Sequence, residues 1–358
     1  MPTEVRPTTT STTSAKPIDD RHPQPPSSTV RQSAPSDRRS DAGSLLSTTA
    51  LFLWLAYLVI VIALPEADLL RKGSITPVTV LAGTWLIALI AWTLTARVRP
   101  ASSAARSLTH FLPWINAAGV WFIVWQLTTS KLGLLTPPYF AAPEVLIASF
   151  LGDWRLLISC LGASAMLFII GYTAGSVLGF CTGLLMGWSR RADYWFHPLL
   201  QTIGPVPAAS LLPLALLLLP TTYASAAFIV GFGAWFPMAT MTRAGVRSVR
   251  RDYIDMARTL GADELFLIRR VAVPSALPDM LTGLFTGLGT SLAALMTAEL
   301  TGVDKGLAWY INWVKGWADY PRMYVGLIIL VTFCRTLMVL LFKIRSSLLA
   351  WQQNLVRW

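Results

Sequence analysis

The sequence predicts an all-α protein that crosses a membrane several times. Of its 358 residues, 54% are hydrophobic and only 13% are charged, and the mean hydropathy is +0.55. This composition excludes an ordinary soluble domain. The net charge of +11 does not indicate nucleic-acid binding, because the basic residues lie between apolar runs and not on one face of a polar domain.

Eight apolar runs follow one another along the chain, and most approach the ~20 residues that cross a bilayer as a helix. They lie near 45–65, 77–96, 112–130, 160–187, 199–219, 223–242, 277–300 and 323–342. The fifth run contains Pro205, Pro207, Pro213 and Pro220, so we expect it to be kinked or partly broken. The sequence shows no metal-ligand cluster and no nucleophile set, so we predict neither a metal site nor catalytic residues.

The basic residues set the expected orientation. Residues 1–44 are rich in Ser, Thr, Pro and Arg and show no apolar periodicity, so we expect a disordered tail. If this tail is cytoplasmic, the cytoplasmic segments hold 21 Lys and Arg residues and the outer loops hold 7. This distribution agrees with the positive-inside rule. Both termini and the loop 243–275, which contains seven arginines, are then cytoplasmic.

The fourth run carries glycines at intervals of four residues. Successive members of this series lie ~40° apart around a helix and therefore form a slowly winding groove. Because lipid gives helices little reason to associate, close backbone approach has to supply the attraction. We interpret the series as a tight helix–helix seam, and a hinge that slides during transport is the alternative. The glycines are Gly171, Gly175, Gly179, Gly183 and Gly187.

Arg335 is the one charge deep within an apolar run. An arginine at this depth costs about 2.5 to 3.5 kcal/mol on insertion scales, so it should face protein or water. A structural role, snorkelling and solute contact all remain open. The other run interiors lack ionisable groups, which argues against a carrier driven by an ion gradient. The chain also lacks a Gly-rich phosphate loop, so an external energy source is expected.

The segment from Arg250 to Pro278 is the longest charged stretch between two apolar runs. Asp252 is expected to cap a short helix that Gly261 ends in a left-handed conformation. A second helix over 263–271 should follow, and Pro274 and Pro278 should then redirect the chain into the seventh run. The product is an amphipathic elbow at the inner membrane surface. An interfacial hairpin without a partner would show the same pattern.

The spacing in this segment resembles the signature of ABC importer permeases. That signature reads Glu-Ala-Ala, three residues, Gly, nine residues, Ile, any residue and Leu-Pro. Here the corresponding residues are Asp255-Met256-Ala257, Gly261 and Val271-Ala272-Val273-Pro274. From about Tyr139 onward the chain is similar to permeases of the nitrate, sulfonate, taurine and bicarbonate importers. Ala142-Pro143-Glu144-Val145, His197-Pro198-Leu199-Leu200 and Ala298-Glu299 carry this likeness.

The resemblance implies a six-helix type I ABC importer permease core over 111–358, preceded by two extra membrane helices over 45–110. Such a subunit is not an enzyme and lies in the bacterial inner membrane, where two copies form a homodimer. It couples through the loop to a separate ABC ATPase, which holds ATP and Mg, and it receives solute from an extracytoplasmic binding protein. No cofactor binds this chain. The implied coupling residues are Asp255, Met256, Ala257, Arg258, Gly261, Ala262, Val271 and Pro274.

The candidate pore-lining residues are Gly204, Pro205, Pro207, Glu299 and Arg335. The resemblance implies a small anion such as nitrate, a sulfonate, taurine or bicarbonate as the solute, with a neutral or cationic nutrient such as a pyrimidine precursor as the alternative. A different class of function is also open. In that second hypothesis the chain is a membrane scaffold that recruits a soluble partner through the same loop.

Overall fold

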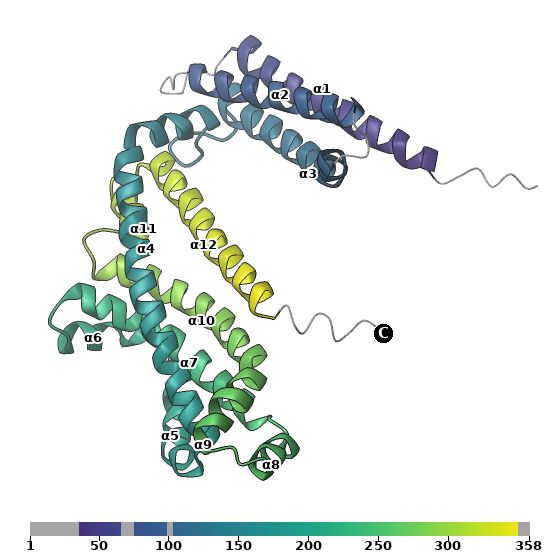
Figure 1. Cartoon of the computed structure of the whole chain (residues 1–358). Coiled ribbons are helices and arrows are strands. Elements are labelled where there is room, and N and C mark those ends of the chain that lie inside the picture. Colours follow the sequence, from purple (N-terminus) through teal and green to yellow (C-terminus); the bar gives the residue numbers. More distant parts are fainter. Residues whose placement is uncertain (1–35, 66–74, 99–102, 350–358) are drawn as a thin grey trace, which may run out of the picture. The chain divides into compact units, whose positions relative to one another are not determined.

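The computed structural model describes residues 36–65, 75–98 and 103–349 of the chain. Over these residues the chain forms helices joined by short loops and contains no strand (Figure 1). Two π-helical turns, η1 and η3, and one 3₁₀ turn, η2, interrupt the series. In chain order the elements are α1 (Ser36–Ala63), α2 (Ile75–Val98), α3 (Ser103–Gln126), η1 (Leu127–Lys131), α4 (Pro143–Trp188), α5 (Arg190–Ile203), η2 (Ala208–Leu211), α6 (Leu212–Leu218), α7 (Thr222–Arg247), α8 (Arg251–Thr259), α9 (Glu264–Phe266), η3 (Leu267–Ala272), α10 (Val273–Thr301), α11 (Leu307–Gly316) and α12 (Tyr320–Leu348).

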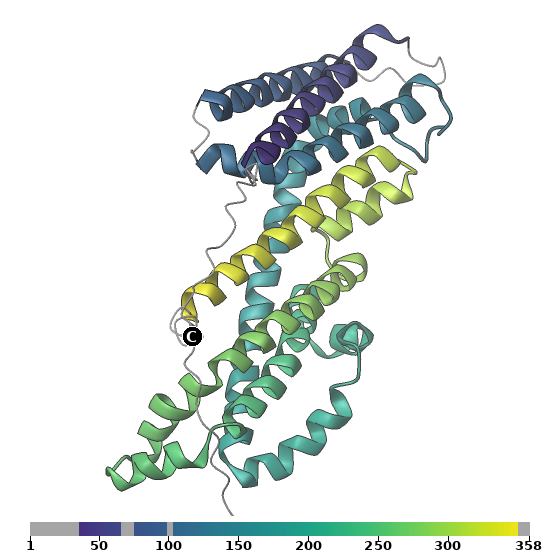
Figure 2. The ribbon, with the colours of Figure 1, turned by 90° about the vertical axis from the view of Figure 1, so that its right-hand side faces the viewer.

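The eight predicted runs fall on these helices. Within the described part of the chain, seven helices are long and apolar enough to cross a membrane, and the fifth run is divided between two shorter pieces. These pieces, α5 and the η2–α6 pair, are bent by 92° (Figure 2). Pro205 and Pro207 lie at the bend, where they supply no amide hydrogen to a helix. The expectation of a broken fifth run is therefore confirmed.

Two helix starts differ from the prediction. α1 already begins at Ser36, inside the segment 1–44 that was expected to be disordered. A helix can extend beyond the apolar run that nucleates it. Residues 1–35 lie outside the described part. α4 begins at Pro143 and not near residue 160. Asp153 lies in the added part of the helix, where it accepts a hydrogen bond from Tyr310 at 2.9 Å and pairs with Arg322 at 3.2 Å.

α4, α7 and α10 form the centre of the fold. α7 lies between the other two, and the buried side chains Leu167, Ile229, Val230 and Leu295 belong to their shared core. α12 packs on the same core through the edge-on contact of Phe333 with Phe168. Figure 1 shows α12 next to α10 and α4.

The glycine series of α4 lies along α7. A β-carbon added to Gly175 would sit 2.0 Å from the carbonyl oxygen of Gly231, and one added to Gly183 would sit 2.5 Å from that of Ala239. Gly171, Gly179 and Gly187 also face α7, and a β-carbon added to any of them would lie 2.6–2.7 Å from the nearest atom of that helix. The two helices therefore pack backbone against backbone along at least four turns, which an alanine in place of these glycines would prevent.

The helices α1 and α2 pack on α3 and form a core of their own with it. Trp54, Tyr57, Leu89 and Leu112 are buried in this cluster, which Ile147 of α4 also contacts. Lys131 of η1 donates from Nζ to the carbonyl oxygens of Val61 and Leu64, at 3.1 and 2.6 Å. A lysine ammonium at this position satisfies the last carbonyls of α1 and suits the negative end of the helix dipole.

A buried carboxylate joins α3 to the start of α4. Glu144, in the first turn of α4, accepts hydrogen bonds from Gln126 at 3.0 Å and from Ser130 at 2.5 Å. All three side chains are buried. The two extra helices are thus connected to the core through α3, η1 and the first turn of α4.

Candidate functional site

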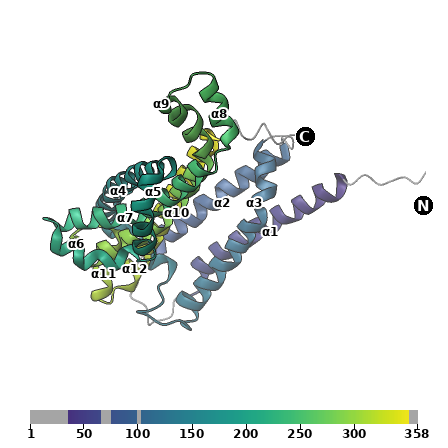
Figure 3. The same cartoon turned by 90° about the horizontal axis from the view of Figure 1, so that it is seen from below.

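The charged segment forms an elbow of two helical pieces. α8 ends at Gly261, whose φ of +86° lies in the left-handed region, and the backbone amide of Ala262 donates to the carbonyl oxygen of Ala257 at 3.0 Å. α9 and η3 follow and continue directly into α10. Seen from below, α8 and α9 lie to one side of α4, α5 and α7 (Figure 3). The predicted left-handed end of the first helix is confirmed.

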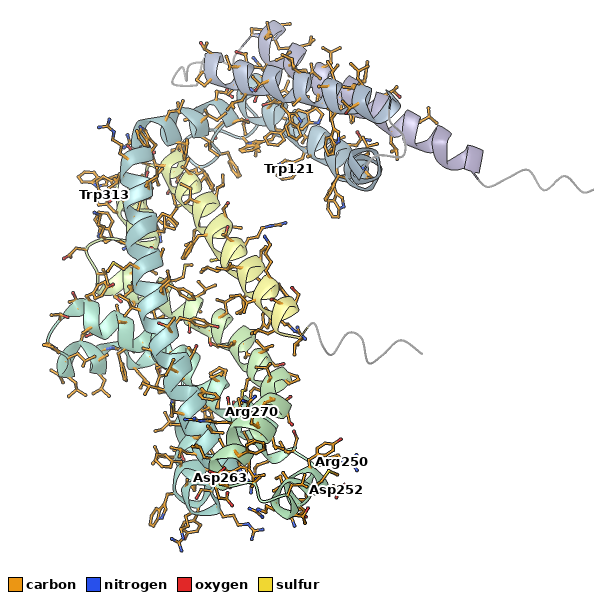
Figure 4. All side chains as sticks on the ribbon, viewed as in Figure 1. Trp121, Arg250, Asp252, Asp263, Arg270 and Trp313 are labelled. Carbon is orange, nitrogen blue, oxygen red and sulfur yellow. The ribbon has the colours of Figure 1, made fainter. Side chains whose placement is uncertain are left out.

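Two details of the elbow were predicted wrongly. The N-cap of α8 is Arg250, with no side-chain cap; Asp252 instead pairs with Arg250 at 2.9 Å, and both are exposed (Figure 4). Pro274 does not redirect the chain, because it stands at the start of α10 and the helix is continuous from Glu264 to Thr301. A proline in a first helical turn lacks only an amide hydrogen that has no intrahelical partner there, and the π-helical turn before it shifts the bonding pattern.

The elbow presents apolar and polar side chains to its surroundings. Leu260 is 83% exposed, Met256 60% and Tyr253 52%. Arg258 pairs with Glu264 at 2.9 Å, which ties α8 to α9. Leu267 is buried and anchors the elbow to the helices behind it. The sequence thus forms a projection whose tip carries apolar side chains that the described part of the chain leaves exposed.

The predicted coupling residues divide between the tip and its base. Asp255, Met256 and Arg258 are exposed on α8, and Gly261 is exposed at the turn. A β-carbon added to Gly261 would meet nothing within 4 Å. The other four predicted residues lie nearer the base. Ala257 is on the inner side of α8, Ala262 is in the turn, Val271 is in η3 and Pro274 is at the start of α10. Only Pro274 of these four is exposed.

The break in the fifth span borders a cavity of about 260 Å³. Its walls come from residues 204–209, which form the break, and from α7 and α10. Three of the candidate pore-lining residues, Gly204, Pro205 and Pro207, lie in this wall, together with Phe232, Phe236, Thr290 and Thr297. Gly204 permits close contact with α7, since an added β-carbon would lie 2.0 Å from Cε2 of Phe236.

Glu299 lies elsewhere. It is 1% exposed and does not line this cavity. Its carboxylate accepts a hydrogen bond from Ser164 at 2.5 Å and from the backbone amide of Ala308 at 2.9 Å, while Ser164 accepts from the amide of Leu307 at 2.8 Å. The side chain fixes the first turn of α11 to α4 and α10, so its geometry is that of a structural contact.

Arg335, the last candidate, is exposed on α12. No ion pair forms at it among the described side chains. Its neighbours on the helix surface, Ile328, Val331 and Val339, are apolar and exposed. The structure therefore does not bring Arg335 together with Glu299, and its role stays open.

One polar network escaped the sequence analysis. Asp193 in the first turn of α5 pairs with Arg243 at 2.5 Å and with Arg247 at 2.8 Å, both in the last turns of α7. It fixes the start of the broken span to the helix that leads into the elbow. The partners are about fifty residues apart in the sequence, and no local pattern announces such a pair.

Comparison with known proteins decides the family. Residues 171–350, half of the chain, match the family described as the binding-protein-dependent transport system inner membrane component. The chain belongs to this family. It is an ABC importer permease, as the spacing of the elbow residues indicated, and the match begins at the first glycine of the α4 seam.

Several relatives of this permease are named after a transported solute. It is 29% identical over 182 residues to SsuC of Escherichia coli, named for aliphatic sulfonates transport, with 49% of this chain and 67% of the relative covered. Nitrate import permease protein NrtB of Synechococcus elongatus is 25% identical over 206 residues, with 51% and 72% covered. Formylaminopyrimidine transport permease protein ThiX of Halalkalibacterium halodurans is 27% identical over 157 residues, with 43% and 62% covered. A solved structure, the inward-facing MetNI methionine ABC transporter, matches 55% of this chain and 98% of its own at 18% identity and a TM-score of 0.48.

Proposed function

We propose that this permease forms, with a second copy of itself, the pathway by which a small solute enters the bacterial cell. A separate ATPase subunit would drive the cycle by pushing on the elbow, and an extracytoplasmic binding protein would deliver the solute. ATP and Mg would bind the ATPase. The relatives named for sulfonates, nitrate and formylaminopyrimidine support a small solute without selecting one of them.

The observation that carries this proposal is the elbow itself. Its tip is apolar and exposed at Leu260, Met256 and Tyr253, and exposed apolar clusters of this kind mark contact sites for other proteins or for the membrane. In an importer permease the ATPase is the protein that such a tip would contact. Its base continues into α10, a helix that lines the cavity. A push on α8 would reach this helix through the Gly261 turn and the Arg258–Glu264 ion pair, and the helix from Glu264 to Thr301 is continuous up to the proposed pathway.

We infer the sides of the membrane from the direction of the spans together with the distribution of basic residues. α4 and α7 run in the same direction, since Gly171 lies near Ala227 and Gly187 near Val246. The elbow and the start of α5 then share one end of the bundle, while α11 and the first turn of α4 share the other. The positive-inside rule supports a cytoplasmic elbow and cytoplasmic termini.

Replacing Gly261 by tryptophan tests the coupling. Nothing lies within 4 Å of a β-carbon added at Gly261, so a side chain has room, but the φ of +86° strains a residue that carries a β-carbon. The effect of bulk on the contact with the ATPase is therefore the difference between the tryptophan variant and its control. We expect the ATPase to co-purify with the wild-type permease, and we expect solute-stimulated ATP hydrolysis in vesicles to fall by about tenfold or more in the variant. Gly261→Asn is the matched control, because asparagine tolerates a positive φ and adds little bulk. Equal hydrolysis in wild type and the tryptophan variant would refute the proposed contact.

A further inference from the structure

The groups that line the cavity at the break in the fifth span indicate which chemical class of solute it can bind. Two aromatic rings, Phe232 and Phe236, come from α7, and two hydroxyl groups, Thr290 and Thr297, come from α10. The main chain of 204–209 closes the remaining side. None of the described residues that line the cavity is charged.

The hydroxyl hydrogens of the two threonines are already used within the fold. Thr290 donates its hydroxyl hydrogen to the carbonyl oxygen of Gly233 at 2.6 Å, and Thr297 donates to that of Ala293 at 3.1 Å. A threonine whose hydrogen is used in this way still has lone pairs on its oxygen. The α10 wall therefore accepts hydrogen bonds from a bound molecule more readily than it donates them.

The break contributes few donors of its own. The amides of Gly204 and Val206 are already bonded to carbonyl oxygens of α5, and Pro205 and Pro207 have no amide hydrogen. The remaining backbone donors on this wall are the amides of Ala208 and Ala209. They open the 3₁₀ turn η2 and therefore have no acceptor within it.

Hydroxyl groups continue along α10 beyond the cavity. Thr282, Thr286 and Thr301 each donate to the carbonyl oxygen four residues earlier, as Thr297 does, and all three are exposed. Exposed threonines with the same bond also occur on other spans, for example Thr173 on α4 and Thr332 on α12. What sets α10 apart is that Thr290 and Thr297 of its series line the cavity.

These groups suit an uncharged solute. A small anion would give up its hydration without meeting a positive side chain, and a cation would meet no carboxylate, so both pay an uncompensated desolvation cost. A neutral planar ring can lie against the phenyl rings, donate N–H groups to the threonine oxygens and accept from the amides of η2. The hydrogen-bond donors and acceptors of such a molecule can then all be satisfied in the cavity.

We propose that this cavity is a solute-recognition site within the permease and that it selects an uncharged planar heterocycle that carries both hydrogen-bond donors and acceptors, in preference to a small oxyanion. The inference rests on the proposed function, because it takes the cavity to lie on the pathway. It favours an uncharged solute, the class that the sequence analysis left open as the alternative, over the small anion.

Equilibrium binding tests this proposal on the full-length permease, purified with its ATPase in lipid nanodiscs. Radiolabelled cytosine serves as the neutral planar probe, and nitrate and ethanesulfonate serve as competitors. We expect saturable cytosine binding that neither anion displaces. Thr290→Val keeps the shape of the side chain and removes the oxygen, so the Kd should rise by about two- to tenfold, as for one lost hydrogen bond.

Thr332→Val is the matched control. Thr332 is an exposed threonine of α12 with the same bond to the carbonyl oxygen four residues earlier, and it does not line the cavity, so cytosine affinity should not change. Displacement by nitrate or ethanesulfonate, the absence of saturable cytosine binding, or an unchanged Kd in Thr290→Val would each overturn the proposal. If the ATPase still co-purifies and responds to the elbow variant, importer function stands and only this inference falls. If no ATPase co-purifies, both fall.

Discussion

Alanine in place of Gly175 is expected to destroy the central helix pair. The added β-carbon would lie 2.0 Å from the carbonyl oxygen of Gly231 and 2.6 Å from its Cα, and both contacts are backbone atoms that cannot turn aside. Overpacking normally costs about 1–3 kcal/mol, and we expect the upper end of this range or more, because α4 and α7 would have to separate. Thermal unfolding of the detergent-purified permease, followed by size-exclusion chromatography, measures the loss.

Gly162→Ala provides the control on the same helix. Nothing lies within 4 Å of a β-carbon added there, and Gly162 is exposed. Since alanine favours a helix over glycine by about 1 kcal/mol, this variant should be as stable as wild type or more so. A Gly175→Ala protein that unfolds at the wild-type temperature would show that α4 and α7 are not held at this distance.

Alanine in place of Glu299 is expected to release α11. The change leaves the amide of Ala308 and the hydroxyl of Ser164 without their acceptor in a buried site, and it opens a cavity. A buried polar group left unpaired costs about 1–3 kcal/mol, so the two groups together should lower the free energy of unfolding by roughly 2–5 kcal/mol. Chemical unfolding in detergent gives the total, and limited proteolysis at 302–320 reports whether α11 has detached.

Glu299→Gln separates hydrogen bonding from charge. Its carbonyl oxygen can still accept from Ala308, so it should lose less stability than the alanine variant. Gly302→Ala serves as a neighbouring control, because its β-carbon would sit at an ordinary 3.4 Å from Leu216. If the alanine and glutamine variants of Glu299 both unfold as wild type does, the carboxylate does not secure α11. Loss of solute uptake with α11 still protected would restore Glu299 as a pathway residue.

The features that sequence reasoning recovered depend on local patterns. The membrane helices follow from apolar runs long enough to cross a bilayer, and the break follows from prolines that cannot bond within a helix. Gly261 was predictable because a helix end followed by a second helix favours a residue with freedom at positive φ. The elbow was also predictable, because the residues whose spacing identifies it lie within one short segment.

The features that were missed depend on partners far apart in the sequence. α4 extends to Pro143 because Tyr310 and Arg322 neutralise the polarity of Asp153, and neither partner is close to it along the chain. α11 begins where Glu299 accepts the amide of Ala308, so its start is fixed by the end of another helix. Asp252 looked like a cap from its spacing alone, but α8 begins at Arg251, so Asp252 lies inside the first turn and not at the N-cap.

The unbroken length of α4 carries one last consequence. At 1.5 Å per residue, its 46 residues correspond to about 69 Å of helix axis, which bends near the start of the helix (Figure 1). Glu144 faces α3 near one end and Gly187 faces α7 at the other, and the helix continues between them. A single inserted residue between them would rotate one end by 100° against the other and turn one set of contacts away from its partners. The number of residues in α4 between Glu144 and Gly187 is therefore constrained, as well as the identity of the residues that make these contacts.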